Sequence, residues 1–229
     1  MESQEIRLAV DIVVFGYQAG KIYVLLAKQK YGTFKERWVV PGGFVLNDEG
    51  LLAAAKRELK EETGVSLASL EQLYTFGDDV KRDPRYRVVS VAYLGTANPS
   101  KMKLQASTDS KEAKWCELDA IPKLPYDHNK IISTAYTRLV AKLNYQPIGF
   151  DLLDTKFPFS DLENLYMTIL QRKIDRRNFR KKIFSFGLLE ETGDQLKQGS
   201  GRPAALYKFN KAKYKQSLKE GINFEIKFA

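Results

Sequence analysis

Residues 43–65, GFVLNDEGLLAAAKRELKEETGV, constrain the fold of this chain more than any other part of its sequence. The run 51–55 consists of good helix formers, and a glycine after a helical run is a common stop signal. We therefore expect a loop followed by a helix, with Asn47 and Asp48 as capping residues and Gly64 at the helix end. The positions that define the pattern are Gly43, Glu49, Arg57, Glu58, Glu61, Glu62 and Gly64.

Three carboxylates share one face of the expected helix. Glu58, Glu61 and Glu62 lie at positions i, i+3 and i+4, and Arg57 precedes Glu61 by one helical turn, close enough to orient it. Clustered carboxylates repel one another unless a hard cation neutralises them, and Mg²⁺ or Mn²⁺ prefers oxygen ligands and bridges to phosphate. We expect the three glutamates to bind the metal and, with Arg57, to form a catalytic group. The alternative is an acidic helix face in contact with solvent only.

The spacing matches the signature of the Nudix hydrolases, and the preceding segment 37–43 resembles the strand and turn that lead into it. This resemblance implies hydrolysis of a nucleoside diphosphate linked to another moiety. A metal-bound water would attack phosphorus while a carboxylate acts as base. Gly43 is expected at the ligand, because a glycine lets the backbone approach without an intervening side chain.

Charge is distributed unevenly along the 229 residues, whose formal net charge is +9. Residues 151–229 hold 16 Lys and Arg against 10 Asp and Glu, whereas residues 1–150 hold 21 against 18. The excess in the last third indicates a polyanionic partner beyond a small nucleotide. The single cysteine, Cys116, fits a reducing cytoplasm and is expected to be buried rather than nucleophilic. No apolar run approaches the length of a membrane span, so we expect no membrane partner.

The first part of the chain alternates as a mixed α/β domain does. Leu8–Phe15 and Ile22–Ala27 are apolar, β-branched runs around a glycine-containing turn and predict a hairpin. Further strands are expected around 70–76, 87–94 and 114–118, and a helix at about 128–143. The order resembles the Nudix α/β/α sandwich with its mixed sheet. Because residues 144–149 read as a linker, we expect a ligand-binding domain at 1–146 and a second domain at 147–229.

The second domain is predicted to be a winged helix-turn-helix, which gives the whole chain an α+β fold class. Ser160 and Glu163 suggest a capping box for a first helix, and Asp175 is expected to cap a second, basic helix at 176–186. A ribbon with a Gly-Arg-Pro tip follows. A basic helix is often only a solvated face, but this order of elements favours DNA binding. The expected DNA contacts are Arg176, Arg177, Arg180, Lys181 and Arg202.

Taken together, the chain resembles the bacterial Nudix-related transcriptional regulators of the NrtR type. The segments that carry the resemblance are GRPAALYKF at 201–209, residues 76–93 and Pro125–His128. It implies a homodimer that binds operator DNA and releases it on binding ADP-ribose or another small effector. Many such regulators lack some of the box carboxylates, whereas this chain keeps all of them, so catalysis stays open.

Several residues outside the box are candidates for the ligand site. Arg82 and Arg85 are expected to clamp phosphates, with plain solvation as the alternative. Asp109 and Glu112 are the candidates for an acid from outside the helix, or are ordinary loop acids. His128, the only histidine, either contacts the ligand, caps the following helix or makes a buried hydrogen bond.

Two functions from different classes therefore compete. The first is a DNA-binding regulator whose Nudix domain binds ADP-ribose or a related nucleoside diphosphate derivative, with or without hydrolysing it. The second is a Mg²⁺-dependent ADP-ribose pyrophosphatase whose C-terminal domain serves dimerisation only. A hydrolase of mutagenic nucleotides ranks last, because it gives the basic domain no role.

Overall fold

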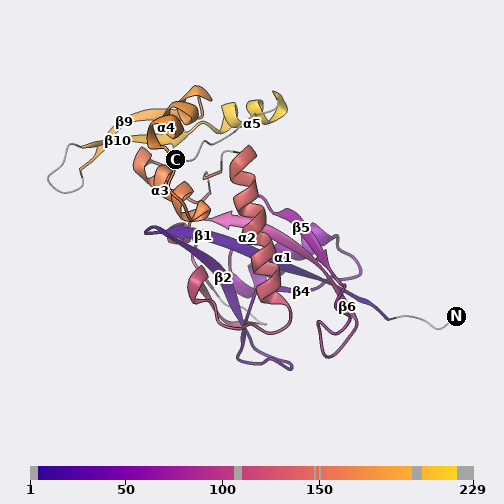
Figure 1. Cartoon of the computed structure of the whole chain (residues 1–229). Helices are drawn as coiled ribbons and strands as arrows, with labels where there is room; N and C mark the ends of the chain where they lie inside the picture. The colour runs from indigo at the N-terminus through magenta and orange to yellow at the C-terminus, as the bar shows by residue number, and fades with distance from the viewer. Residues whose placement is uncertain (1–4, 106–109, 147, 150, 198–202, 221–229) are drawn as a thin grey trace. The chain divides into compact units, whose positions relative to one another are not determined.

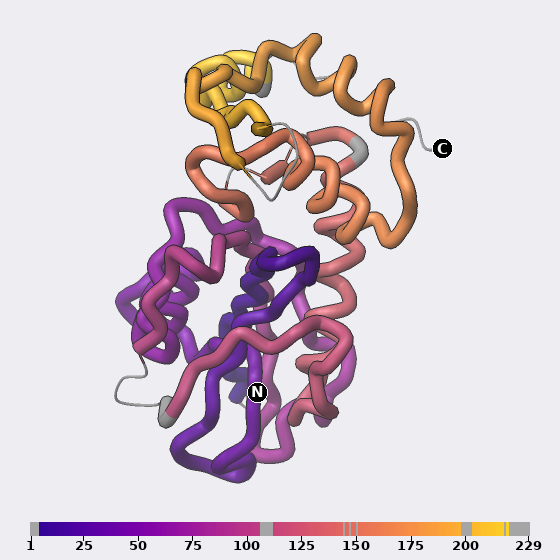
Figure 2. Tube along the Cα trace, turned by 90° about the vertical axis from the view of Figure 1, so that its left-hand side faces the viewer, coloured from indigo at the N-terminus to yellow at the C-terminus, as the bar shows by residue number. Residues whose placement is uncertain are grey.

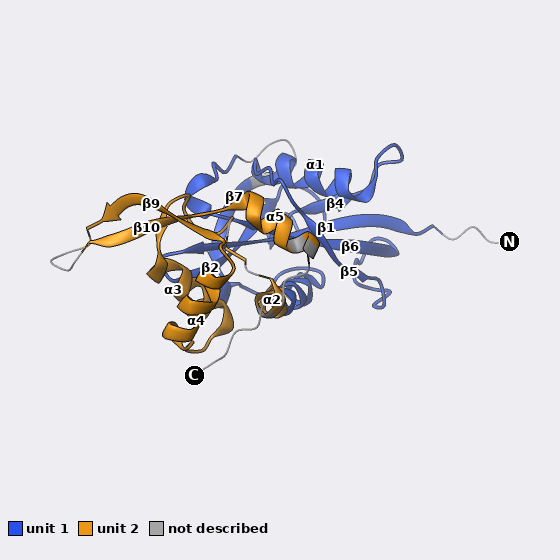
Figure 3. Cartoon of the chain, turned by 90° about the horizontal axis from the view of Figure 1, so that it is seen from above, with its two compact units in different colours: residues 1–138 blue, residues 139–229 orange. Residues whose placement is uncertain are grey.

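The computed structural model describes residues 5–105, 110–146, 148–149, 151–197 and 203–220. The chain divides into two compact units, residues 1–138 (unit 1) and residues 139–229 (unit 2). The division falls inside helix α2 (His128–Tyr145), where the colour changes in Figure 3. Each unit has its own sheet. The domain boundary expected at 146/147 stays a prediction.

Unit 1 is built on a mixed sheet of seven strands, drawn mainly in indigo to magenta in Figure 1. The path β3-β2-β1-β6-β5 is extended by β4, which pairs with β1, and by β7, which pairs with β2. The β1–β6 pair is parallel and the other pairs are antiparallel. The strands are β1 (Arg7–Gln18), β2 (Lys21–Gln29), β3 (Trp38–Val39), β4 (Gly42–Phe44), β5 (Glu71–Phe76), β6 (Val88–Ala97) and β7 (Ser110–Glu117). Two 3₁₀ turns, η1 (Pro99–Lys101) and η2 (Leu118–Ala120), complete it.

The predicted hairpin and the sandwich arrangement are confirmed. β1 and β2 are joined by Ala19 and Gly20, which both have positive φ (49° and 76°), as a tight two-residue hairpin requires. Along β1, Val10, Ile12 and Val14 belong to the core cluster that includes residues of helix α1 (Leu51–Thr63). Phe15, of opposite parity, meets Tyr136 of α2 edge to face at 6.0 Å. In the Cα trace of Figure 2, the indigo segment that contains β1 and β2 lies among the purple and magenta segments of unit 1.

The expected helix of residues 51–63 is present, but its start differs from the prediction. The N-cap is Gly50, without a side-chain hydrogen bond, so Asn47 and Asp48 do not cap α1. Glu49 instead accepts a hydrogen bond from the Leu46 amide and thereby closes the preceding turn. Gly64 ends the helix in the left-handed conformation, as predicted (φ 76°).

Unit 2 contains the predicted helix pair and ribbon. Its elements are β8 (Phe157–Pro158), α3 (Phe159–Leu170), α4 (Arg176–Ser185), β9 (Leu189–Leu196), β10 (Ala204–Phe209) and α5 (Lys211–Glu220), after the last turns of α2. The strands form an antiparallel sheet in the order β8-β10-β9. Two helices followed by a β-ribbon make this unit a winged helix.

The caps of unit 2 follow the prediction at one helix and not at the other. Asp175 caps α4, since its side chain accepts a hydrogen bond from the Asn178 amide at 3.0 Å. The capping box predicted at Ser160 is wrong, because α3 begins at Phe159 after Pro158 and has no side-chain cap. Phe159 is buried at this position, so the apolar side chain of the first helical residue joins the core. Within the described residues, no helix has the length and apolar character needed to cross a membrane.

Candidate functional site

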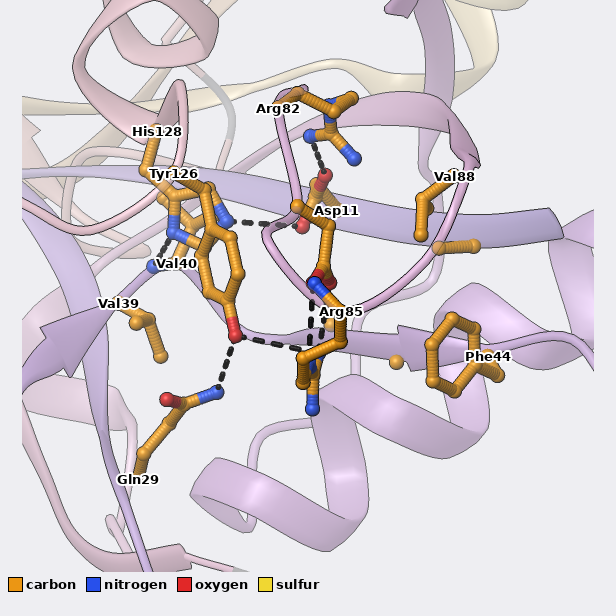
Figure 4. Close-up of a pocket in the computed structure, with 14 residues that line it drawn as sticks. Asp11, Gln29, Val39, Val40, Phe44, Arg82, Arg85, Val88, Tyr126 and His128 are labelled. Carbon is orange, nitrogen blue, oxygen red and sulfur yellow. Dashed lines mark hydrogen bonds and ion pairs between the residues drawn. The ribbon is translucent and has the colours of Figure 1, made fainter. Parts of the chain in front are cut away.

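A pocket opens in unit 1 where β1, β4, the segment before β6 and the residues at the start of α2 meet. It holds roughly 470 Å³ of empty space, part of it open to solvent. Apolar side chains form one part of the wall and a dense group of charged and polar side chains forms the rest (Figure 4). The lining residues used below are Asp11, Gln29, Gly42, Gly43, Arg82, Asp83, Arg85, Tyr126 and His128.

Arg82 is the centre of a buried charge network at this pocket. Its guanidinium donates to both carboxylate oxygens of Asp127, from Nη2 at 2.6 Å and from Nε at 3.0 Å. Nη2 also donates to Asp11 Oδ2 at 3.1 Å. Only 5% of the Arg82 side chain is exposed. The positive charge of Arg82 is therefore already paired with two carboxylates inside the protein.

Asp11 joins the sheet to the rest of this network. It accepts a hydrogen bond from Ser90 Oγ at 2.5 Å, and its Oδ1 lies 3.4 Å from His128 Nε2. Burial alone would raise the pKa of Asp11. The facing His128, Arg82 and Ser90 outweigh that effect and lower the pKa from its ordinary value of 3.8 to about 2. Asp11 therefore stays ionised at neutral pH.

His128 makes the buried hydrogen bond that was one of its three predicted roles. Its Nδ1 accepts from the Val40 amide at 3.1 Å, which leaves the ring proton on Nε2, toward Asp11. Val40 precedes the Pro41-Gly42-Gly43 turn, so the imidazole also fixes one wall of the pocket.

Arg85 is the cation of the pocket that keeps access to solvent. Its side chain is 34% exposed, and Nε and Nη2 form a bidentate pair with the buried carboxylate of Asp83, at 3.0 Å and 2.7 Å. Nη2 also lies 3.3 Å from the Tyr126 hydroxyl, which in turn lies 3.5 Å from Gln29 Nε2. Figure 4 shows that hydroxyl between Gln29 and Arg85. Arg85 is thus held in place with its exposed side toward the pocket.

The box carboxylates lie against the glycine turn that lines the pocket. The Gly42 amide donates to Glu62 Oε2 at 2.9 Å. A Cβ at Gly43 would come within 2.3 Å of Glu58 Oε1, so only a glycine leaves this carboxylate in place. Gly43 therefore brings the acidic helix face next to the pocket without a side chain between them.

Arg57 organises the acidic face as the spacing predicted. Nη1 donates to Glu58 at 2.7 Å and to Glu61 at 3.1 Å, while Nε and Nη2 hold Glu49 at 3.0 Å and 2.5 Å. The hydrogen bonds from Arg57 lower the pKa of Glu49 to about 2. Burial raises the pKa of Glu58 despite the same arginine. Arg57 thus bridges three of the acids, Glu49, Glu58 and Glu61, while Glu62 accepts the hydrogen bond from the glycine turn.

The donor chemistry of this face suits a hard divalent cation, since carboxylate oxygens are its preferred ligands. Within the described ranges, however, no three acidic, histidine or cysteine side chains converge on one point suited to a metal. Glu58 and Glu61 turn to Arg57 instead. The metal site of Glu58, Glu61 and Glu62 stays a prediction.

Two of the remaining candidate residues have defined places. Glu112 is exposed on β7 and pairs with Lys28 at 3.7 Å, as an ordinary surface acid does. Cys116 is buried and its Sγ lies 3.7 Å from the Ala120 carbonyl, which agrees with the expected packing role. Asp109 and Arg202 lie outside the described residues.

The basic residues of α4 divide into two kinds. Arg177 and Lys181 are exposed, and among the described residues no ion pair holds them. Arg176 lies 3.8 Å from Glu163 of α3. The Arg180 guanidinium lies 4.7 Å from the Phe159 ring and 5.0 Å from the Phe184 ring, and Nη2 donates to Tyr207 Oη at 3.3 Å. Arg180 thus joins α4 to the ribbon strand β10.

The sequence did not single out several residues that build the pocket. Asp11 could have been noticed as the one charged residue inside the apolar run 8–15. Tyr126 and Asp127 have a sequence signal only as part of the family-like segment Pro125–His128. Gln29 and Ser90 carry no sequence signal of their own, because their roles depend on strands paired across the sheet.

The Asp11 carboxylate makes a testable contribution to acid stability. A carboxyl whose pKa is lower in the folded protein stabilises the fold while ionised, and that stability is lost as pH falls from about 4 to about 2. We expect this loss to amount to roughly 2 kcal/mol for Asp11. Asp11→Asn should flatten the pH dependence in that window. Urea titrations followed by Trp38 and Trp115, which both belong to unit 1, would measure it. Equal pH dependence in both proteins would contradict the assignment.

Comparison with known proteins agrees with both units. Residues 5–137 match the family model of the NUDIX domain, and residues 149–209 match that of the NrtR DNA-binding winged helix domain. The chain therefore belongs to the Nudix family, among the NrtR-type members that carry a winged helix. It is 34% identical to the ADPR responsive transcriptional repressor NtrR of Acinetobacter baylyi, over 88% of this chain and 81% of the relative.

Solved structures give the same picture. Shewanella oneidensis NrtR in complex with a 27mer DNA superposes with a TM-score of 0.77 at 29% identity, covering 91% of this chain and 95% of that one. The NUDIX domain of the same protein in complex with ADP ribose reaches 0.55 at 32% identity, over 61% of this chain and 90% of that one.

Two further relatives of unit 1 are enzymes by name. An ADP-ribose pyrophosphatase of Methanocaldococcus jannaschii is 40% identical over 111 residues, which cover 48% of this chain and 63% of that protein. A bifunctional NMN adenylyltransferase/ADP ribose pyrophosphatase of Francisella tularensis, complexed with AMP and a manganese ion, has a TM-score of 0.52 at 26% identity, over 60% and 43% of the two chains. A divalent metal ion is thus present in the solved structure of a relative that contains a domain similar to unit 1.

Proposed function

We propose that this protein is a transcriptional repressor whose winged helix binds operator DNA and whose Nudix unit binds ADP-ribose as the signal for release. The observation that carries the proposal is the similarity to an ADP-ribose-responsive repressor, which runs through both units over 88% of the chain. The concentration of positive charge in residues 151–229 supports a DNA partner. We place the protein in the cytoplasm, with the DNA that it would regulate.

DNA binding with and without effector tests the proposal. Fluorescence anisotropy of labelled DNA from upstream of the protein's own gene should report binding at moderate salt, and ADP-ribose should weaken it. AMP at the same concentration serves as control, because it lacks the second phosphate and the terminal ribose. Absence of DNA binding, or binding that ADP-ribose leaves unchanged, would falsify the proposed function.

ADP-ribose is expected in the pocket of unit 1, with its diphosphate beside Arg85 and the Gly42-Gly43 turn. Arg85 has an exposed guanidinium already oriented by Asp83, whereas Arg82 is committed to Asp11 and Asp127. The backbone at Gly43 can approach the ligand closely. Arg82 would then support the site from behind rather than touch phosphate.

Arg85→Ala should weaken ADP-ribose binding by about 10- to 100-fold, because it removes a charge-assisted hydrogen bond donor worth about 1.5–3 kcal/mol. DNA affinity without ligand should stay within about threefold, since Arg85 lies in unit 1. Isothermal titration calorimetry and the anisotropy assay measure the two affinities. Lys81→Ala, which removes a nearby exposed charge, is the matched control. Equal ADP-ribose affinity in all three proteins would place the ligand elsewhere.

For DNA, we propose that α4 provides the recognition helix and that Arg177 and Lys181 supply its outward charges. Arg176, Arg180 and Arg202 are further candidate contacts. Helix-turn-helix proteins commonly bind two half-sites as symmetric dimers, so we also propose a homodimer. Light scattering coupled to gel filtration would measure its mass.

A second candidate function is Mg²⁺- or Mn²⁺-dependent hydrolysis of ADP-ribose. It is favoured by the complete acidic set on α1 and by the 40% identity to an ADP-ribose pyrophosphatase. Glu58, Glu61 and Glu62 are the residues that would hold the metal, which when bound supplies charge stabilisation and an activated water. Arg57 would orient these acids through the hydrogen bonds described above. Release of AMP from ADP-ribose with Mg²⁺ tests it, and Glu61→Gln and Glu62→Gln are controls. Turnover no faster than that of the two variants would reject hydrolysis.

A further inference from the structure

Helix α2 belongs to both compact units. It begins at His128 in unit 1 and ends at Tyr145 in unit 2, with the division after Arg138. Eighteen residues of continuous helix therefore join the unit that contains the pocket to the unit that contains α4. A displacement or rotation at the first turn of a continuous helix is transmitted along it, because its backbone hydrogen bonds resist local bending.

The first turn of this helix is part of the pocket. Tyr126 and His128 line it, and Asp127 holds Arg82 by a bidentate pair. The Asp127 carbonyl also accepts from the Lys130 and Ile131 amides, at 2.9 Å and 3.1 Å, and so starts the helical ladder. A shift of Arg82 or of Asp127 therefore displaces the beginning of α2.

Tyr126 adds a strained backbone at the same point. Its φ of 55° lies in the left-handed region, which is uncommon for a bulky aromatic residue. Such a conformation persists only where surrounding contacts hold it, and it is concentrated at functional and switch sites. Phe34 contacts the Tyr126 ring edge to face at 4.8 Å. The Tyr126 hydroxyl accepts hydrogen bonds from Arg85 and Gln29. The contact with Arg85 lies where the proposed diphosphate would bind.

We propose that Tyr126, Asp127 and His128 form a coupling hinge, called here the α2 hinge, through which occupancy of the pocket changes the DNA affinity of unit 2. This inference rests on the proposed function and names its regulation. A diphosphate that takes hydrogen bonds from Arg85 competes with the Tyr126 hydroxyl and loosens one contact that holds the left-handed backbone. The start of α2 then has one arrangement when the pocket is empty and another when it is filled, and the bound ligand favours the second.

The experiment measures the coupling ratio, defined as the DNA dissociation constant with saturating ADP-ribose divided by that without it. Tyr126→Phe removes the hydroxyl that meets Arg85, and Asp127→Asn weakens the link between Arg82 and the helix start. We expect each to lower the ratio by about fivefold or more, while the DNA dissociation constant without ligand changes less than about threefold. Lys130→Ala, an exposed residue in the same turn, should keep the full ratio.

A second pair of variants tests transmission without touching the pocket. Thr137 is exposed on α2 one residue before the division between units. Thr137→Gly softens the helix there, whereas Thr137→Ala preserves it. The glycine variant should lower the coupling ratio and the alanine variant should not. This comparison tests transmission along α2 even if Asp127→Asn folds poorly. A normal ratio in Tyr126→Phe and Thr137→Gly would overturn the α2 hinge and leave the proposed function intact. A ratio of one in the unmodified protein would overturn both.

Discussion

Arg82→Ala is expected to lower the free energy of unfolding of unit 1 by about 3–5 kcal/mol, because it leaves the buried carboxylate of Asp11 and the half-buried carboxylate of Asp127 without their shared cation. Asp11 and Asp127 both pair with Arg82, and the Arg82 side chain is almost fully enclosed. Asp11 would find no equivalent partner, since its remaining contacts are a serine hydroxyl and a histidine ring.

Urea denaturation followed by tryptophan fluorescence measures this effect in the right unit. Both tryptophans, Trp38 and Trp115, lie in unit 1, so unfolding of unit 2 does not contribute to the signal directly. Lys81→Ala removes an exposed positive charge next to Arg82 and should change the midpoint little. If the midpoint of Arg82→Ala equals that of Lys81→Ala, the arginine is not the structural centre of the pocket.

The combined substitution Arg177→Ala and Lys181→Ala is expected to weaken operator binding on the order of 100-fold, through loss of two outward contacts on α4. The slope of log affinity against log salt should fall by about 0.9 for each lost phosphate contact. The stability of unit 2 should change little, because both side chains are exposed. Anisotropy titrations over a series of salt concentrations give both the affinity and the slope.

Two comparisons make this result specific. Lys211→Ala with Lys215→Ala removes the same formal charge from exposed positions on α5 and should keep most of the affinity. Arg180→Ala separates two roles of one residue. If Arg180 contacts phosphate, the salt slope falls. If it acts through its contacts with Phe159 and Tyr207, affinity and unit stability fall while the slope holds. Unchanged affinity in the Arg177/Lys181 variant would exclude α4 as the recognition helix.

The elements with strong local signals could be predicted from the sequence. The helix at 51–63 has a run of good helix formers and a terminal glycine, and the hairpin has two β-branched runs around a short turn. Helix α4 has its aspartate cap and a basic outer face. These signals lie within a few residues of one another, so short-range preferences decide them.

The pocket could be predicted only in part, because its roles depend on residues far apart in the chain. The sequence pointed to Arg82 and Arg85 alike as phosphate clamps. Their difference comes from Asp11, which is 71 positions from Arg82 and reaches it through the sheet. The same holds for His128 and the Val40 amide, 88 positions apart. The cap predicted for α3 was wrong for a related reason. The helix begins at the buried Phe159, which packs in the core, and not after the polar Ser160 beside it.

The two adjoining glycines of the pocket turn carry different evolutionary constraints. A side chain at Gly42 would collide with backbone, 2.3 Å from the Val10 carbonyl, so glycine is required there whatever chemistry the family member performs. The three atoms that a side chain at Gly43 would meet first all belong to the Glu58 carboxylate. A descendant that loses this acid would thereby lose one of two reasons to keep its second glycine, the other being the close approach of the backbone to the ligand. We expect substitutions at position 43 to follow the disappearance of Glu58 in a lineage, while position 42 stays fixed.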